Sequence, residues 1–216
     1  MSTTNIYVIR HGQSQGNLND WFVGHSDIDL TDLGYEQAEL TANFFDSIAV
    51  DAIYSSDLSR AYHTAEATAR RKNLPIIADP GLREIFGGQW ECQVFMSLGD
   101  THPQEFQVWT QDFGNAVCPQ GESVLGMQKR IYDTVEKLAN ANIGKTICIF
   151  THAVAIRTLT AKWKNLSVQQ LQHHPYASNS SVTHAVYEEG KFTLLEYGRD
   201  DFIGNKITRL IDEAFI

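Results

Sequence analysis

The stretch IYVIRHGQSQGN, residues 6–17, sets the architecture of the chain and raises its first functional question. Its first half is a short run of β-branched, aromatic and aliphatic residues, which is typical of a strand buried inside a sheet. The run ends abruptly at Arg10 and His11, and Gly12 and several polar residues follow. The sequence therefore predicts a buried strand that carries a cation and an imidazole at its carboxyl end.

Similar short runs recur along the chain and alternate with helical patterns. Further strands are predicted at AIYS (52–55), TICIFT (146–151), SVTHAVYE (181–188) and KFTLLEYG (191–198). Helices are predicted within residues 31–48, 56–72, 121–142 and 153–163. Glu189 and Gly190 predict a tight hairpin turn, and Ser56 or Asp57 is the expected cap of the second helix. The alternation predicts a three-layer α/β sandwich, with a mainly parallel central sheet and helices on both faces.

Residues 86–121 interrupt this alternation with glycines, prolines and aromatic residues and without a clear strand. We expect a single domain over residues 1–216, into which this segment is inserted as a small lid of short helices and loops. The aromatic residues in and near it either line an apolar mouth for a ligand or form the lid's own core. They are Trp21, Phe22, Phe86, Trp90, Phe106, Trp109 and Phe113.

Composition narrows the functional classes. The net charge of −9 argues against a nucleic-acid partner, because phosphate backbones attract a basic surface. A few local arginines can still hold a small phosphorylated ligand inside an acidic protein. The three cysteines form no C-x-x-C pair, and no apolar run approaches the roughly 18 residues of a membrane helix. We therefore expect a cytoplasmic protein without a membrane partner. His102, His173 and His174 lack further ligands at suitable spacing, so no metal is predicted.

Ionisable residues occur where several predicted strands end or helices begin. They are Arg10, His11, Arg60, Glu84 and His152. Because the carboxyl ends of parallel strands meet at one edge of a sheet, these side chains can converge. Two guanidinium groups suit a tetrahedral dianion, a neutral imidazole can attack phosphorus, and a carboxylic acid can protonate the departing oxygen. The set therefore predicts phosphoryl transfer. Arg157, further along the helix after His152, is expected to bind a carboxylate.

The motifs RHGQSQGN, SDLSRAYHTA, LREIFGGQWE, PQGES and THAVAIRTL, in this order, resemble those of the histidine phosphatase superfamily, which includes the cofactor-dependent phosphoglycerate mutases. The resemblance runs from about residue 6 to residue 186. It implies an α/β sandwich, a phosphohistidine intermediate and no metal or other cofactor.

Carried over to this sequence, the resemblance makes His11 the nucleophile and Glu84 the proton donor and later the base. It makes Arg10, Arg60 and His152 catalytic residues that hold the phosphoryl group, and Asn17 a further hydrogen-bond donor to the substrate. Ser14 either contacts the substrate or caps the following helix. Gly12 is expected to let the backbone approach the imidazole of His11.

Three positions depart from the glycines that the family usually has. Ala153 follows the second histidine and is expected to narrow the substrate-binding pocket. Cys92 and Gln120 are expected at the lid and the rim of the pocket. None of these departures removes a reactive group.

The reactive residues are common to mutases and phosphatases. A mutase must hold a second anionic group, yet residues 85–128 contain acidic residues and neither lysine nor arginine. The sequence therefore favours a metal-independent, histidine acid-type phosphatase that hydrolyses a small phosphorylated metabolite. A cofactor-dependent phosphoglycerate mutase and a non-catalytic phospholigand-binding module are the alternatives. The substrate and the oligomeric state are left open.

Overall fold

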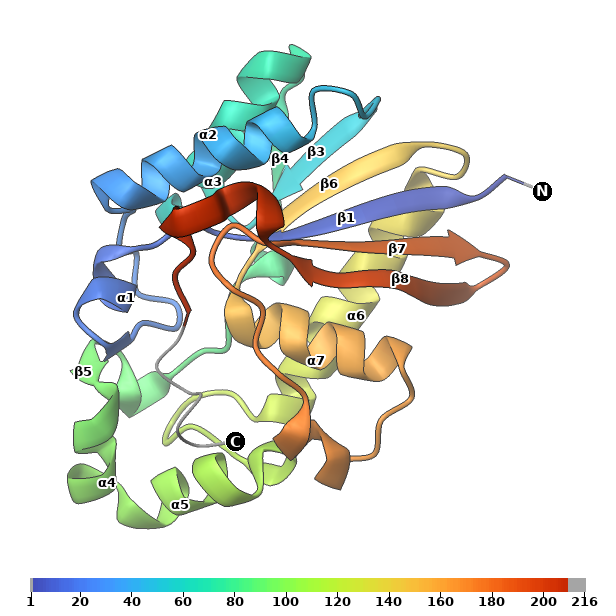
Figure 1. Ribbon diagram of the computed structural model, residues 1–216. Coiled ribbons are helices and arrows are strands. Elements are labelled where there is room, and N and C mark those ends of the chain that lie inside the picture. The colour runs from blue at the N-terminus through green and yellow to red at the C-terminus, as the bar shows by residue number, and fades with distance from the viewer. Residues whose placement is uncertain (1, 210–216) are drawn as a thin grey trace.

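A six-stranded central sheet organises the computed structural model, which describes residues 2–209 (Figure 1). In the order of the sheet, the strands are β4 (Ile76–Ala78), β3 (Ala52–Ser55), β6 (Thr146–Thr151), β1 (Thr4–Arg10), β7 (Val182–Glu188) and β8 (Lys191–Arg199). The first four run parallel to one another, whereas β7 is antiparallel to β1 and β8 is antiparallel to β7. The predicted α/β fold with a mainly parallel sheet is confirmed.

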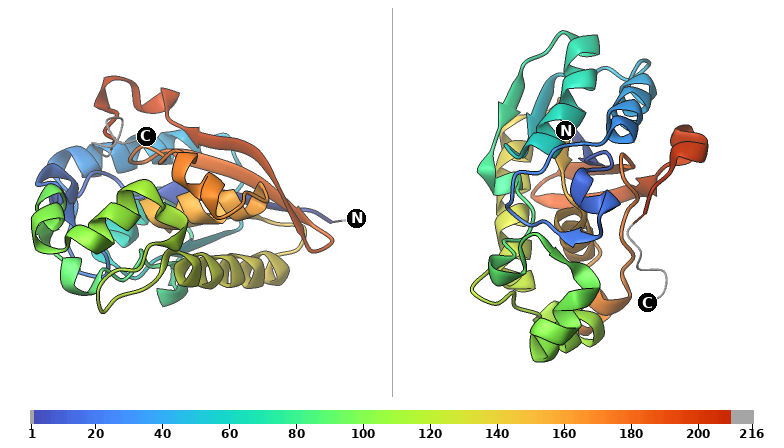
Figure 2. Two further views of the ribbon diagram at one scale, coloured as in Figure 1. Left: turned by 90° about the horizontal axis from the view of Figure 1, so that it is seen from below. Right: turned by 90° about the vertical axis from the view of Figure 1, so that its left-hand side faces the viewer.

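Helices cover both faces of this sheet (Figure 2). On one face lie α2 (Asp32–Phe44) and α3 (Ser59–Lys72), and on the other lie α6 (Val124–Ala141) and α7 (Ala153–Trp163). The short helices α1 (Gln15–Leu18), α4 (Leu98–Thr101) and α5 (Pro103–Gln111) lie beyond the end of the sheet (Figure 1). Side chains alternate across β1, so Ile6 and Val8 pack in the core that includes α6 and α7, whereas Ile9 packs in the opposite core with Ala65 of α3. The chain thus has the three predicted layers.

The apolar face of α6 shows most clearly how the spacing of apolar residues in the sequence determines which side of a helix packs on the sheet. Its residues at helical spacing are all buried: Val124, Met127, Ile131, Val135 and Leu138. The helix begins at the N-cap Ser123, whose hydroxyl accepts a hydrogen bond from the amide of Gly126. Burying each large apolar side chain contributes about 1.5–3 kcal/mol, so this face fixes the helix on the sheet.

The structure confirms the predicted hairpin turn and contradicts the predicted cap of α3. The hairpin turn is confirmed, because Glu189 and Gly190 both have positive φ angles, of 50° and 77°. The cap predicted at Ser56 or Asp57 is wrong, because α3 begins at Ser59 after an N-cap leucine that makes no side-chain bond. The carboxylate of Asp27 instead accepts hydrogen bonds from the amide and hydroxyl of Ser59, at 2.7 and 2.9 Å. A residue distant in sequence therefore caps this helix.

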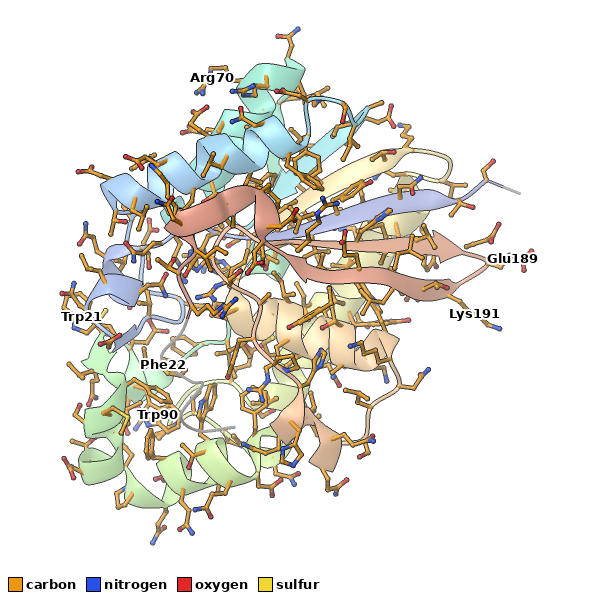
Figure 3. The ribbon with its side chains drawn as sticks, viewed as in Figure 1. Trp21, Phe22, Arg70, Trp90, Glu189 and Lys191 are labelled. Carbon is orange, nitrogen blue, oxygen red and sulfur yellow. The ribbon has the colours of Figure 1, made fainter. Side chains whose placement is uncertain are left out.

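The segment 86–121 contains α4, α5, short 3₁₀ turns and the strand β5 (Gln93–Val94), which pairs with β2 (Trp21–Phe22). Its aromatic residues pack mainly against one another. Trp90 and Phe22 lie edge to face at 5.3 Å between ring centroids, next to each other at the lower left of Figure 3, and both contact Trp109 in the same way. Trp90 and Phe113 are fully buried. Most of the aromatic set thus forms the lid's own core.

Within residues 2–209, none of the helices combines the length and the apolar character that are needed to cross a bilayer.

The register between β1 and β6 determines where the two histidines lie. Arg10, the last residue of β1, pairs with Thr151, the last residue of β6. The backbone amide of His11 donates a hydrogen bond of 3.0 Å to the carbonyl of Thr151. His11 and His152, which directly follow these strands, therefore reach the same point of the sheet edge.

Gly12 is required for the close approach of this strand end to α2. A Cβ atom at Gly12 would lie 2.4 Å from the carbonyl oxygen of Gly34, so the constraint comes from the α2 backbone and not from the His11 ring as predicted. We expect Gly12→Ala to lower the free energy of unfolding by about 2 kcal/mol or more, because the backbone cannot yield as a side chain can. Urea denaturation measures this change. Gly99→Ala, whose Cβ would meet only the ring of Phe106 at 3.2 Å, is the control. Equal effects of the two substitutions would contradict this account.

Candidate active site

A cavity of about 130 Å³, partly open to solvent, lies where β1, β3 and β6 end. The predicted site residues that line it are Arg10, His11, Ser14, Asn17, Arg60, Glu84 and Ala153. His152 is fully buried beside them, and its ring centroid lies 5.2 Å from that of His11. The structure thus brings all of the predicted site residues together.

The imidazole of His11 has a fixed orientation. Its Nδ1 donates a hydrogen bond of 2.6 Å to the carbonyl of Gly12, which leaves the lone pair on Nε2. Burial, and then the charges of Arg60 and Arg10, hold the pKa of His11 well below its usual value. At neutral pH the ring is therefore uncharged, as a nitrogen nucleophile must be.

Two buried arginines flank this imidazole. Arg10 donates from Nη1 to the carbonyl of Ala177 at 2.6 Å, and Arg60 donates to the carbonyls of Ser26 and Gly24 at 2.9 and 2.7 Å. Burial lowers the pKa of Arg60 to about 10, so its guanidinium keeps its charge at neutral pH. Two guanidinium groups at this place suit the oxygens of a phosphoryl group.

The loop that holds Arg60 is itself held by Glu91, a residue for which we predicted no role. The carboxylate of Glu91 accepts hydrogen bonds from the amides of His25 and Ser26, both at 2.6 Å, and from that of Gly87 at 2.9 Å. Since Ser26 supplies one of the carbonyls that bind Arg60, Glu91 fixes the position of the guanidinium from the lid side.

Glu84 lies against the N-terminus of α7. Its carboxyl oxygens accept hydrogen bonds from the amides of Ile85, Val154 and Ala155, at 2.9, 3.0 and 3.2 Å. These bonds and the nearby arginines favour the charged form, yet burial outweighs them and raises the pKa of Glu84. The carboxyl group is thereby kept protonated to a higher pH than an exposed glutamate, which suits a proton donor.

His152 has two buried ring nitrogens, and neither has a hydrogen-bond partner among residues 2–209. Burial and the charge of Arg60 hold the pKa of His152 well below its usual value, so the ring is neutral. A buried polar group without a partner costs about 1–3 kcal/mol, which native proteins tolerate mainly where a ligand provides the missing bond. A phosphoryl oxygen beside His11 would provide it.

Ser14 and Asn17 form a capping box at the start of α1. The Oδ1 atom of Asn17 accepts hydrogen bonds from the amide and hydroxyl of Ser14, both at 3.1 Å, and from the Nδ2 group of Asn179, also at 3.1 Å. The Nδ2 group of Asn17 has no partner among the described residues. Ser14 therefore caps the helix, one of the two roles we considered, and leaves the amide of Asn17 as a donor for the cavity.

Asn179 is a positioning residue that belongs to none of the sequence motifs. Its Nδ2 group also donates to the carbonyl of His11 at 3.0 Å, so one amide connects the loop of His11 to Asn17. It lies in the loop before β7, within a run of small polar residues that carries no recognisable pattern.

Arg130 holds the backbone around Glu84. It pairs with Glu122 at 2.8 Å and donates to the carbonyls of Gly81, Arg83 and Glu84 at 2.9–3.0 Å. The imidazole of His25 lies 2.9 Å from the same Glu84 carbonyl. Glu122 belongs to the PQGES motif, so the sequence contained a signal for it. Its partner Arg130 lies on α6, outside any motif.

Arg157 binds no carboxylate within residues 2–209, so this prediction is wrong. Its guanidinium donates to the carbonyls of Leu171, Gln172 and His174 at 2.6–2.9 Å. It also lies between the rings of Phe113 and Tyr176, at 4.0 and 4.2 Å from their centroids. Carbonyl oxygens and aromatic faces thus replace the expected carboxylate.

At two of the three positions that depart from the family glycines, the backbone has a conformation that is typical of glycine. Cys92 and Gln120 have φ angles of 59° and 55°, in the region that glycine adopts without strain. Neither lines the cavity, so the expectation that Gln120 lies at its rim is wrong, whereas Cys92 lies within the segment 86–121, where we expected it. Ala153 does line it, next to His152.

The histidines considered for a metal have other contacts. His174 is buried, and its Nε2 lies 2.9 Å from the hydroxyl of Thr160. Over residues 2–209, no group of three or more His, Cys, Asp or Glu side chains is arranged to hold a metal ion.

The fold and this edge of the sheet define a protein of the phosphoglycerate mutase-like class. The chain belongs to the histidine phosphatase superfamily (branch 1), whose model matches residues 6–200. It is 30% identical to a putative phosphoserine phosphatase 2 of Hydrogenobacter thermophilus, over 88% of this chain and 93% of that protein. It is 26% identical to the adenosylcobalamin/alpha-ribazole phosphatase of Escherichia coli, over 78% and 83% of the two chains. The structure of Bacillus stearothermophilus YhfR superimposes with a TM-score of 0.89 and 30% identity, covering 93% of this chain and 99% of that one. These similarities support a phosphatase.

Asn17 allows a nearly isosteric test of the cavity. Asn17→Asp keeps an oxygen for the capping box, removes the Nδ2 donor and adds a negative charge. We expect phosphate affinity to fall by at least ~10-fold, because a donor becomes a repelling charge. Isothermal titration with inorganic phosphate measures the loss. Asn19→Asp, at an exposed position outside the cavity, should retain wild-type affinity. Unchanged binding by Asn17→Asp would exclude Asn17 from the anion site.

Proposed function

We propose that the chain is a metal-independent phosphomonoesterase that hydrolyses a small phosphorylated metabolite through a phosphohistidine at His11. The main support is the state of His11, a neutral imidazole with its Nε2 lone pair available between two buried arginines. Family membership and the phosphatases among its relatives support the same reaction class.

In the first step, Nε2 of His11 attacks phosphorus and the bond from phosphorus to the ester oxygen breaks. Arg10 and Arg60 stabilise the negative charge on the phosphoryl oxygens, and the side chains of His152 and Asn17 donate further hydrogen bonds to them. Glu84 gives its proton to the departing oxygen, so that an alcohol and not an alkoxide leaves.

In the second step, the Glu84 carboxylate removes a proton from a water molecule. The resulting oxygen nucleophile attacks phosphorus, the bond from Nε2 to phosphorus breaks, and inorganic phosphate is released. Glu84 is protonated again and His11 is again neutral, so the residues are ready for the next substrate.

The proposal includes no metal, because the two guanidinium groups and the imidazole of His152 provide the interactions that a cation would supply to the phosphoryl oxygens. The free thiols Cys92, Cys118 and Cys148 support the further prediction of a reducing, cytoplasmic location.

A phosphoglycerate mutase is the second candidate, because it uses the same first step. It would return the phosphoryl group to a bound glycerate and depend on bisphosphoglycerate. The absence of lysine and arginine from residues 85–128 speaks against it, since two anionic groups would then lie beside an acidic lid. A phospholigand-binding module without activity is disfavoured, because both His11 and Glu84 are present in the cavity.

His11→Ala should abolish hydrolysis of 4-nitrophenyl phosphate, with a loss on the order of 10³-fold or more, because no other group can form the covalent intermediate. Wild-type enzyme that is quenched with acid should lose its protein-bound phosphate. Quenching with alkali should preserve a labelled phosphohistidine. EDTA should leave the rate unchanged. His173→Ala, at an exposed position outside the cavity, is the control. Hydrolysis by His11→Ala at the wild-type rate would disprove the mechanism, and stimulation of phosphoryl exchange by bisphosphoglycerate would favour the mutase.

The shifts at His11 and Glu84 predict a bell-shaped pH dependence of kcat/KM. The lowered pKa of His11 places the acidic limb below the usual range of histidine, because activity is lost where this ring binds a proton. The raised pKa of Glu84 places the alkaline limb above the usual range of glutamate, because activity is lost where this carboxyl loses its proton.

Glu84→Gln should remove the alkaline limb and lower the rate of alkyl phosphate cleavage by about 10²–10⁴-fold. The first turnover of 2,4-dinitrophenyl phosphate should be much less affected, since its leaving group needs no proton. Stopped-flow measurement of phenol release separates the two cases, with the exposed Glu66→Gln as control. An equal loss for both esters would show that Glu84 is not the proton donor.

A further inference from the structure

His25 lies between the two residues whose backbone carbonyls bind Arg60. The carbonyl oxygens of Gly24 and Ser26 accept hydrogen bonds from the guanidinium at 2.7 and 2.9 Å. The backbone amide of His25 itself donates to the carboxylate of Glu91 at 2.6 Å. Because these bonds hold the backbone on both sides of His25, this segment has a fixed position relative to the guanidinium of Arg60.

The side chain of His25 extends from this segment to Glu84, the candidate proton donor. Its Nε2 atom lies 2.9 Å from the backbone carbonyl oxygen of Glu84. A carbonyl oxygen can only accept a hydrogen bond, so Nε2 carries the hydrogen and donates it. The ring also packs against that of Phe86, at 5.2 Å between centroids. One imidazole thus contacts the loop of Glu84 at two places.

The imidazole of His25 is uncharged in this environment. Burial lowers the pKa of His25 from its usual value, and the bond to the Glu84 carbonyl opposes the shift only in part. The charges of Arg130 and Arg83 lower this pKa further, whereas the carboxylate of Glu91 raises it. At neutral pH the ring therefore has its hydrogen on Nε2 and its lone pair on Nδ1.

The Glu84 carbonyl accepts a second hydrogen bond, from Arg130 at 2.9 Å. Two lone pairs allow both donors to bind the same oxygen. The donors come from different parts of the fold, because Arg130 belongs to α6 and His25 to the segment that binds Arg60. Arg130 therefore fixes Glu84 relative to a helix of the outer layer, whereas His25 fixes it relative to Arg60.

We propose that His25 is a positioning residue that sets the place of the proton donor Glu84 relative to Arg60, which binds the phosphoryl group. This inference rests on the proposed phosphatase function and extends it to a residue that does not line the cavity. His25 exchanges no proton with the substrate. It connects the group that binds the phosphoryl oxygens with the group that protonates the departing oxygen.

The geometry of proton transfer makes this connection important. The departing oxygen is bonded to phosphorus, so its position follows that of the phosphoryl group at Arg60. Glu84 can protonate this oxygen only from hydrogen-bond distance, about 2.6–3.2 Å. A displacement of about 1 Å can cost on the order of 10²-fold in rate. Loss of the His25 bond should therefore slow the step that needs the proton and spare phosphate binding.

His25→Leu removes the donor and keeps an apolar side chain at the position. We expect kcat/KM for phenyl phosphate to fall by ~10-fold or more, because its leaving group needs the proton from Glu84. The value for 2,4-dinitrophenyl phosphate should stay within about threefold, since this leaving group departs without a proton. His25→Gln, whose side-chain amide can donate to the same carbonyl, should recover most of the loss. His173→Leu, at an exposed position outside the cavity, is the matched control and should keep both wild-type values.

A double-mutant cycle shows whether His25 acts through Glu84. In the Glu84→Gln background, His25→Leu should cause no further loss with phenyl phosphate, because the proton donor is already absent. Isothermal titration with inorganic phosphate should give the wild-type affinity for His25→Leu, since main-chain carbonyls still hold Arg60. An equal loss for both esters, or a full additional loss in the Glu84→Gln background, would overturn the inference.

A measurement without turnover separates this inference from the proposed function. Long-range proton–nitrogen NMR correlation of protein with isotope-labelled histidine identifies the tautomer of each neutral ring, and the signals missing from His25→Gln assign His25. We expect the Nε2–H tautomer in wild type. If wild type hydrolyses no ester, the proposed function fails, and the tautomer decides the contact with Glu84. Nε2–H then supports the inference, and Nδ1–H overturns it.

Discussion

The parallel register between β1 and β6 is the constraint on which the site depends. Since Arg10 pairs with Thr151, the residues that follow both strands lie at one level, and His11 and His152 come into contact there. A shift by one residue would move every side chain of β1 to the opposite face of the sheet. It would exchange Val8 for Ile9 between the two cores and turn Arg10 away from the cavity. The packing of the two helical layers therefore maintains the geometry of the site as well as the fold.

Around this contact, backbone groups fix the positions of two buried arginines. Arg10 and Arg60 donate to carbonyl oxygens, which hold their guanidinium groups in place. Burial, together with the charge of Arg60, keeps the imidazoles of His11 and His152 neutral. Burial acts on Glu84 in the opposite sense, since it raises the pKa of this carboxyl group despite the nearby cations. The protonation states of the site thus follow mainly from burial.

Local sequence was sufficient for the elements whose signal is local. The β-branched runs identified β1, β3, β6, β7 and β8, and periodicity identified the buried face of α6. The three-residue edge strand β4 was missed, because so short a run has no distinct pattern. The start of α3 was misplaced, because its cap comes from Asp27, which a local cap pattern cannot reveal.

The same distinction applies to the site. Residues within the ordered motifs were found and converge as expected. Asn179 and Arg130 were missed, because each acts through a contact between segments that only the fold brings together. The assignment of Arg157 failed for a related reason, since backbone carbonyls and aromatic rings as binding partners leave no trace in the sequence.

The unpartnered nitrogens of His152 also have a consequence for the lifetime of the protein. These nitrogens have no protein partner among residues 2–209, and a bound phosphate ester that supplies their hydrogen bonds stabilises only the folded state. The folded population then depends on how often the site is occupied. Molecules that are turning over substrate are protected from unfolding and proteolysis, whereas idle molecules are the first to be degraded. The abundance of this phosphatase would in this way follow the supply of its substrate without any dedicated regulator.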